Sequence, residues 1–297
     1  MIKASAPGSL IMFGEHSVLR GKHAIVLAIE KRLHITLEPT TTRTISINSS
    51  LGHHVTSLDR IVVQPPFQYV LQTLQNFRPS TGLNITITSD MPATMGFGTS
   101  AAVVVSLLGG LMALRGNDWT DQLFKNVLQI VQKVQGMGSG ADVMASIKGG
   151  VSLYRAHPTF YRSLPVEADL FAAYSGSKTP TAEVVKHVAG RFSAFPDLLK
   201  SLDDANDELT LQAAKCLTNG KVLGDLFNTG AGLMEAFGVH TPGLSKFLWG
   251  LREQSYGVKL SGSGLGDCAI GAVKNQICPE DSFPIVVSEQ GLTVEIA

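Results

Sequence analysis

Residues 92–102 read Pro-Ala-Thr-Met-Gly-Phe-Gly-Thr-Ser-Ala-Ala, a glycine-rich loop that runs directly into an apolar segment. The segment from Thr99 to Leu114 is apolar almost all round, and its length and its Thr-Ser start predict a buried helix. Glycines let successive backbone N–H groups face one point, and a helix N-terminus adds unpaired donors and a positive dipole end. The loop is therefore a candidate phosphate site, and the alternative is a tight turn in which Thr99 only caps the helix. It is neither a Walker A loop nor a dinucleotide fingerprint.

Two more glycine-rich stretches follow. Residues 136–146 read Gly-Met-Gly-Ser-Gly-Ala-Asp-Val-Met-Ala-Ser, so that Asp142 stands at the head of a short helical pattern. Such an acid is usually a cap or a first-turn residue, and the functional alternative is a group that accepts a hydroxyl proton. Residues 259–268 read Lys-Leu-Ser-Gly-Ser-Gly-Leu-Gly-Asp-Cys between two β-prone segments. This stretch either forms a hairpin turn or lets backbone approach a ligand closely.

Strand and helix patterns surround these loops in both halves of the chain. Alternating and β-prone runs predict strands at 2–6, 10–13, 23–29, 33–37, 44–47, 83–88, 151–154, 170–174, 258–261, 268–273 and 292–296. Helical spacing predicts helices at 67–77, 99–114, 120–134, 142–147, 181–188, 197–217, 221–237 and 242–254. The fold class is therefore α+β, and we expect two domains, 1–155 and 156–297.

The composition excludes several classes of function. Lysine plus arginine number 24 and aspartate plus glutamate 24 in 297 residues, which disfavours nucleic acid or an anionic membrane surface as a partner. The three scattered cysteines form neither a disulfide framework nor a zinc spacing, which favours a cytoplasmic protein. No apolar run reaches the roughly 18 residues of a membrane span, and we expect neither a signal peptide nor an anchor.

Taken in order, three motifs resemble the signatures of the GHMP kinase superfamily. They are Ser5-Ala6-Pro7-Gly8 with the Gly-Glu-His-Ser-Val segment 14–18, the loop Gly96-Phe-Gly-Thr-Ser-Ala-Ala, and Lys259-Leu-Ser-Gly-Ser-Gly. A chance match to all three in order is far less probable than a match to one. The resemblance implies an N-terminal domain like ribosomal protein S5 domain 2, a ferredoxin-like C-terminal domain, and an active site in the cleft between them. It also implies ATP and Mg²⁺ as cofactors, and a homodimer as one possible assembly.

The resemblance also assigns roles to residues. The Gly-Glu-His-Ser-Val segment is most similar to the mevalonate kinases, which implies that Glu15 and His16 contact an acceptor such as mevalonate; otherwise Glu15 is a surface acid and His16 a core histidine. Asp142 takes the place of the catalytic aspartate. The predicted cofactor-binding residues are Pro92, Gly96, Phe97, Gly98, Thr99, Ser100 and Ala101, with Ser100 also a magnesium ligand. Ser139, Lys178, Ser261 and Gly262 complete the predicted substrate site.

Two departures from the family pattern matter. The first motif of mevalonate kinases usually ends in a lysine that pairs with the catalytic aspartate, and Ser9 stands there instead. Phosphoryl transfer depends on charge neutralisation, so another cation must compensate, and we consider Lys3, Lys22, Lys148 and Lys178. Lys178 lies between small residues and is the most suggestive of these, although it is otherwise an ordinary loop lysine. The glutamate that binds magnesium is also missing from the stretch 130–133.

These departures leave alternatives open. Phosphomevalonate kinases also lack that glutamate, but they favour tyrosine over histidine at position 16. Another GHMP small-molecule kinase is a further option. A protein of another class would bind nucleotide or an isoprenoid precursor as a sensor without catalysis. A further alternative is a structural or interaction protein that binds no ligand.

Overall fold

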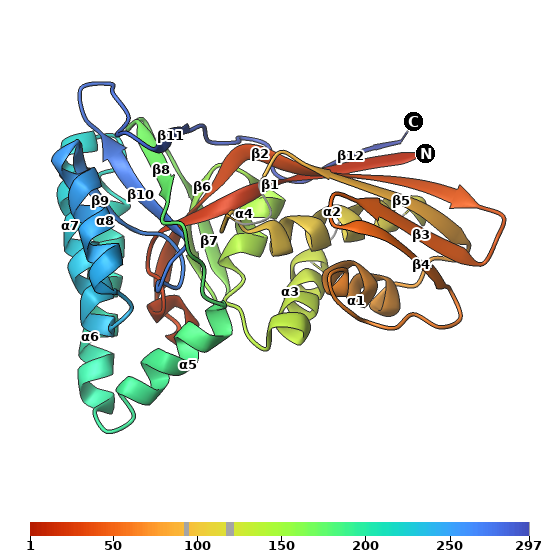
Figure 1. Ribbon diagram of the computed structural model, residues 1–297, viewed down its shortest axis with the longest axis horizontal. Coiled ribbons are helices and arrows are strands. Elements are labelled where there is room, and N and C mark those ends of the chain that lie inside the picture. The colour runs from red at the N-terminus through yellow and green to blue at the C-terminus, as the bar shows by residue number, and fades with distance from the viewer. Residues whose placement is uncertain (92–94, 117–121, 297) are drawn as a thin grey trace.

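The computed structural model describes residues 1–91, 95–116 and 122–296. These residues form two β-sheets, each covered by helices (Figure 1). Within the described residues, the first sheet has eight strands in the order β12-β1-β2-β5-β3-β4, and β6 and β7 extend it beside β2. The second sheet has four strands in the order β11-β8-β10-β9. The predicted α+β class with two units is confirmed.

The strands of the first sheet are β1 (Ile2–Phe13), β2 (His23–Thr40), β3 (Thr44–Ser49), β4 (Gly52–Ser57), β5 (Gly82–Ser89), β6 (Val151–Arg155), β7 (Phe160–Leu164) and β12 (Thr293–Ile296). Those of the second are β8 (Leu170–Tyr174), β9 (Ser255–Leu260), β10 (Cys268–Val273) and β11 (Ser282–Ile285). The sequence patterns did not predict β4, β7 or β11. These are short strands, and β4 and β7 alternate little between buried and exposed positions.

The long β1–β2 pair positions the first motif. The sequence predicts a break at Pro7-Gly8, but β1 runs through it, and the pairing with β2 shifts register between these two residues. A bulge of this kind absorbs a residue that cannot donate to the ladder. A Cβ on Gly8 would lie 2.6 Å from the carbonyl oxygen of Phe97, so the missing side chain lets the phosphate loop approach β1. Ser9 follows at once and is nearly inaccessible.

Four helices lie beneath the first sheet in Figure 1: α1 (Gln68–Asn76), α2 (Thr99–Leu114), α3 (Gln122–Gln135) and α4 (Ala141–Lys148). The helix α2 packs on β1 and β2 and is also contacted by α1, α3 and α4. This position explains why its sequence is apolar on every side. Its bounds agree with the prediction, whereas residues 120 and 121 of the next predicted helix lie outside the described residues.

The helices α7 (Gly220–Phe237) and α8 (Pro242–Glu253) pack on the second sheet, and α6 (Pro196–Ala213) packs on α7. The helix α5 (Thr181–Arg191) adds Val184 and Val188 to the core of this unit. Its core includes Phe171, Val184, Phe237 and Leu248. One of these helices, α6, reaches back to the first unit and contacts the short helix η1 (Ser17–Arg20). The two units are therefore joined next to the first motif.

The chain ends beside its beginning, because β12 pairs with β1 (Figure 1). Arg32 holds the segment before β12 by donating hydrogen bonds to the carbonyl oxygens of Gln290 at 2.9 Å and Gly291 at 2.7 Å. The domain boundary at residue 155 stays a prediction; the β6–β7 hairpin on either side of it belongs to the first sheet. No helix in the described part of the chain is long and apolar enough to cross a membrane.

Candidate active site

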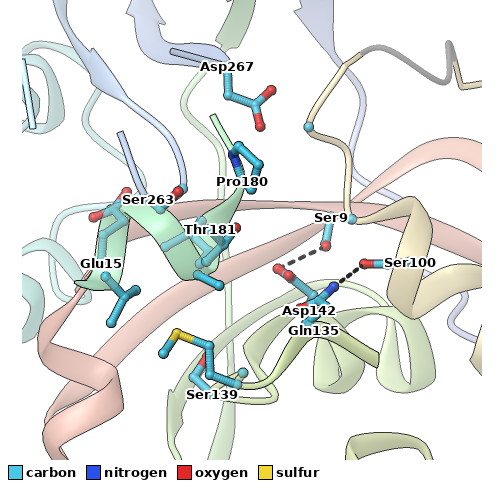
Figure 2. A pocket seen from close by; sticks show the side chains of 18 of the residues that line it. Ser9, Glu15, Ser100, Gln135, Ser139, Asp142, Pro180, Thr181, Ser263 and Asp267 are labelled. Carbon is cyan, nitrogen blue, oxygen red and sulfur yellow. Dashed lines mark hydrogen bonds between the residues drawn. The ribbon is translucent and has the colours of Figure 1, made fainter. Parts of the chain in front are cut away.

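A cavity of about 710 Å³ opens where the three glycine-rich loops meet the start of α5 (Figure 2). The predicted site residues that line it are Glu15, His16, Gly96, Gly98, Thr99, Ser100, Ser139, Asp142, Lys178, Ser261 and Gly262. Phe97 and Ala101 are not part of the lining, because their side chains are buried in the core. Pro92 lies outside the described residues.

The phosphate loop enters α2 through a left-handed residue. Gly98 has a φ of 63° and is the N-cap, and no side chain accepts a hydrogen bond there, so Thr99 is not the cap. A Cβ on Gly98 would lie 2.1 Å from Ser9 Oγ, and the backbone N–H of Ser9 donates to the carbonyl oxygen of Phe97 at 2.9 Å. The first amides of α2 therefore have no side-chain partner at the cap, which suits an anionic ligand.

Asp142 lies in the first turn of α4, facing this loop. Ser9 Oγ donates a hydrogen bond to Asp142 Oδ1 at 3.2 Å, shown as a dashed line in Figure 2. Burial raises the pKa of Asp142; the hydrogen bond from Ser9 and the charge of Lys178 oppose the rise, and the charge of Asp267 adds to it. A carboxylate with a raised pKa and one weak partner is a competent proton acceptor.

The turn before α4 is held in place by Tyr154. Tyr154 Oη donates a hydrogen bond to the carbonyl oxygen of Ser139 at 2.6 Å. Gly140 has a φ of 87°, and a Cβ there would lie 2.9 Å from Tyr154 Oη. Only glycine fits this position without displacing the tyrosine, so the glycines of this loop hold Asp142 in place.

Glu15 and His16 line the other end of the cavity. Glu15 is buried and forms an ion pair with Lys259, which is itself fully buried at the start of the third loop. His16 Nε2 donates a hydrogen bond to the carbonyl oxygen of Ser263 at 2.8 Å, and its buried Nδ1 has no hydrogen-bond partner within the described residues. Burial lowers the pKa of His16 to about 4, so the ring is neutral at pH 7. Glu15 is thus a buried acid and not a surface acid. The Nδ1 of the neutral His16 ring can accept a hydrogen bond from a ligand.

The third loop and α6 support this end. Ser261 Oγ donates to the carbonyl oxygen of Ile11 at 2.9 Å. Burial raises the pKa of Glu15, and the charge and hydrogen bond of Lys259 oppose the rise, with a smaller contribution from the backbone of Gly262. Asn206 Nδ2 donates to the carbonyl oxygen of Glu15 at 3.0 Å. The first motif is therefore held by both the third loop and α6.

Ser100, the predicted magnesium ligand, has a neighbour that the sequence analysis missed. Gln135 Nε2 donates to Ser100 Oγ at 3.0 Å (Figure 2). The same nitrogen donates to Tyr69 Oη at 2.8 Å. Gln135 is the last residue of α3 and follows the stretch 130–133, which lacks the glutamate of the family pattern. Within residues 1–91, 95–116 and 122–296, no group of three histidine, cysteine or acidic side chains gathers to hold a metal.

Lys178 faces a second residue that the sequence analysis missed. Its Nζ lies 3.7 Å from Asp267 Oδ2 of the third loop. A Cβ on Gly96 would lie 1.9 Å from the same oxygen, so Asp267 rests against the backbone of the phosphate loop. The signal available in the sequence was an acid inside an otherwise small and apolar loop, next to Cys268.

Comparisons with known proteins agree with this arrangement. Residues 67–150 match the family described as GHMP kinases N terminal domain, and residues 212–277 match GHMP kinases C terminal. A mevalonate kinase from Archaeoglobus fulgidus is 31% identical over 296 residues, which cover 98% of this chain and 99% of that protein. The chain therefore belongs to the GHMP kinase family and is an ATP-dependent phosphotransferase.

Within that family the chain is similar in sequence to mevalonate kinases. The structure of mevalonate kinase from Methanococcus jannaschii has a TM-score of 0.82 at 23% identity and covers 97% of this chain and 98% of that one. Phosphomevalonate kinase from Streptococcus pneumoniae has a TM-score of 0.77 at 18% identity and covers 92% of each chain. Mevalonate kinase and phosphomevalonate kinase both share the fold of this chain, so the fold does not distinguish their two acceptors. The side chains of the cavity determine which acceptor fits.

Proposed function

We propose that this kinase transfers the terminal phosphoryl group of ATP to the primary hydroxyl of mevalonate, giving 5-phosphomevalonate for isoprenoid biosynthesis. The observation that carries the choice of acceptor is the charge of the cavity. Among the described residues that line it, Lys178 is the only lysine and there is no arginine, so a single cationic side chain serves both ATP and the acceptor. An acceptor with a phosphate would need more positive charge than this.

ATP fits across the start of α2. A second cavity of about 270 Å³ shares Gln68, Tyr69, Thr99 and Ser100 with the first, so the two cavities meet at this helix end. Its other walls include Leu33, Phe67, Ile87 and Val103, which suit the flat apolar faces of a base. We place the adenosine there and the phosphates on the loop and the helix end.

The acceptor lies at the end of the cavity formed by the first and third loops. The free Nδ1 of His16 can accept a hydrogen bond from a hydroxyl group, whereas the charge of Glu15 is balanced by Lys259. His16 is therefore the acceptor contact, and Glu15 keeps the loop in shape. Ser139, Ser261 and Gly262 form the remaining polar wall.

Asp142 lies between the phosphate loop and the acceptor and takes the hydroxyl proton as the new O–P bond forms. The bond from the terminal phosphorus to the bridging oxygen breaks, and ADP leaves. The hydrogen bond from Ser9 orients the carboxylate. Transfer is direct, without a phosphorylated enzyme.

The oxygen donors at the start of α2 fit Mg²⁺, an ion that prefers oxygen and keeps several waters. Ser100 is the residue we propose to hold it, together with phosphate oxygens of the nucleotide, and Gln135 orients the Ser100 hydroxyl. When bound, the ion neutralises charge on the phosphates.

We also propose that the enzyme works in the cytoplasm, which its three free cysteines favour, and that it is a homodimer as its family often is.

A coupled assay of ADP release tests the proposal. Mevalonate, phosphomevalonate, homoserine and galactose are compared at equal concentrations with Mg·ATP, and the product is identified by phosphorus NMR. We expect turnover with mevalonate and little with the other three. A preference for phosphomevalonate would overturn the choice of acceptor. ATP-induced thermal stabilisation without any turnover would indicate a sensor.

A further inference from the structure

The first motif supplies no positive charge to the phosphate end of the cavity, because Ser9 stands where its lysine is expected. The group that contacts Asp142 here is the neutral hydroxyl of Ser9, which is packed closely against Gly98. A transferring phosphoryl group must still be neutralised by a positioned cation or by metal ions. Of the four lysines considered from the sequence, Lys178 lines this cavity. Lys22 pairs with Asp204, Lys148 lies over the ring of Tyr161, and Lys3 lies on β1 between β2 and β12.

The backbone on either side of Lys178 is fastened to the third glycine-rich loop. The backbone N–H of Asp267 donates to the carbonyl oxygen of Ser177 at 2.6 Å. Thr179 Oγ1 donates to the carbonyl oxygen of Leu265 at 2.8 Å. Lys178 therefore sits between two cross-links, and the loop that carries it cannot drift away from the cavity. An ordinary solvated lysine would not need this support.

The carboxylate that faces Lys178 has an unusual setting. Asp267 has a φ of 74°, which is uncommon for a residue other than glycine, and this conformation turns its side chain onto the phosphate loop at Gly96. Its Oδ1 is buried and has no hydrogen-bond partner among the residues that the structure describes. Lys178 Nζ, 3.7 Å from Oδ2, is the cation near it, and the lysine side chain is 44% exposed toward the cavity and solvent. The carboxylate thus holds one end of the lysine while leaving it free to reach a ligand.

We propose that Lys178 is the catalytic cation that replaces the missing lysine of the first motif, and that Asp267 is the positioning residue that holds it beside the transferring phosphoryl group. This inference rests on the proposed function, because it requires that a phosphoryl group is transferred in this cavity. Lys178 gives up no proton. Its charge balances the oxygens of the terminal phosphoryl group while the proton of the acceptor hydroxyl passes to Asp142 and ADP leaves.

The first test compares Lys178→Met with Lys178→Arg and with Lys186→Met. Lys186 is an exposed lysine on α5, so its substitution removes the same charge outside the cavity. We expect kcat to fall about 10²- to 10³-fold in Lys178→Met, with little change in the KM for ATP, and to be partly restored by arginine. Lys186→Met should retain the wild-type kcat. A Lys178→Met enzyme with wild-type kcat would overturn the proposal.

The second test is a double-mutant cycle with Asp267→Asn. If Asp267 acts through Lys178, Asp267→Asn lowers kcat by about 10- to 100-fold, and the double variant is no slower than Lys178→Met alone. If the kcat of the double variant instead falls by the product of the two single losses, Asp267 acts independently of Lys178 and its positioning role is overturned. Thermal stabilisation by Mg·ATP is measured in every variant, so that a loss of kcat is assigned only to a protein that folds and binds nucleotide.

The two proposals fail in different ways. A wild-type enzyme that phosphorylates none of the four acceptors removes the proposed function, and with it the reaction in which Lys178 would act. The other outcome is a wild-type enzyme that phosphorylates one acceptor while Lys178→Met and Asp267→Asn remain fully active. In that case the kinase function stands, and only the proposed roles of these two residues are overturned.

Discussion

The two ends of the cavity differ in how completely their buried charges are paired. At the acceptor end, Glu15 is matched by Lys259, and Asp203 accepts hydrogen bonds from Ser17 and from Arg20, the latter at 2.5 Å. At the phosphate end, Asp142 has a single neutral partner in Ser9. The charges at the acceptor end are therefore paired within the protein, whereas the Asp142 carboxylate at the phosphate end remains available to a ligand.

This difference follows from the roles of the two ends. Buried charges that are fully paired fix a loop in one conformation but cannot take part in proton transfer without breaking the pair. A buried carboxylate that is incompletely paired is costly to the fold and is typical of a catalytic site. The phosphate end should therefore carry activity and the acceptor end stability, and matched substitutions can separate the two.

The largest effect is expected from Asp142→Asn. This change keeps the shape of the side chain and removes the proton acceptor, so kcat should fall about 10³- to 10⁴-fold, or roughly 4–5.5 kcal/mol of activation free energy. The stability of the fold should not fall, because the variant removes a buried charge. Steady-state kinetics and urea unfolding measure the two quantities.

Asp203→Asn is the matched change at the acceptor end. It weakens the contacts with Ser17 and Arg20 and should lower the free energy of unfolding while kcat stays within a few-fold of wild type. If Asp203→Asn instead reduced kcat as strongly as Asp142→Asn, the division between the two ends would be wrong.

The next effect is on stability and concerns the ion pair of the acceptor end. Lys259→Met leaves the Glu15 carboxylate buried without its cation, and we expect a loss of about 3–5 kcal/mol in the free energy of unfolding. The double variant Lys259→Met with Glu15→Gln removes both charges and should recover much of that loss. Chemical denaturation of the three proteins measures this, and a double variant less stable than Lys259→Met would contradict the pairing argument.

The sequence predicted the parts of this site that depend on local pattern. The apolar run after the phosphate loop gave the bounds of α2, and the glycine loops gave the backbone positions that line the cavity. It could not predict the partners of each charge, because these come from distant parts of the chain: Glu15 meets Lys259, and Asp267 meets Lys178. The register shift at Pro7-Gly8 was missed for the same reason, since the turn signal is local and the pairing that overrides it is not.

A smaller effect is the dependence of stability on pH through His16. Its folded pKa of about 4 is below the unfolded value of 6.5, so between these values the unfolded chain binds more protons. The contribution of His16 to stability is therefore complete above about pH 6.5 and is lost as the pH falls toward 4, by up to about 3 kcal/mol. The variant His16→Asn, which lacks the titrating imidazole, should show a shallower loss.

Urea unfolding at several pH values between 4 and 8 measures this difference. Any effect of His240, whose pKa is also lowered by burial, is common to both proteins and cancels. Parallel stability curves for wild type and His16→Asn would mean that His16 does not stay neutral in the folded protein.

The smallest effect, and the finest test of the contrast between the two ends, is expected from Ser9→Ala. The variant removes the hydrogen bond to Asp142, which is worth about 1 kcal/mol, so kcat at neutral pH should fall about fivefold. That hydrogen bond lowers the pKa of Asp142, and losing it raises this pKa, so the acid limb of the kcat profile should move to higher pH. A fall in kcat without this movement would mean that Ser9 only fills space beside Gly98. A movement to lower pH would mean that a group other than Asp142 controls the limb, since a carboxylate deprived of a donor becomes easier to protonate.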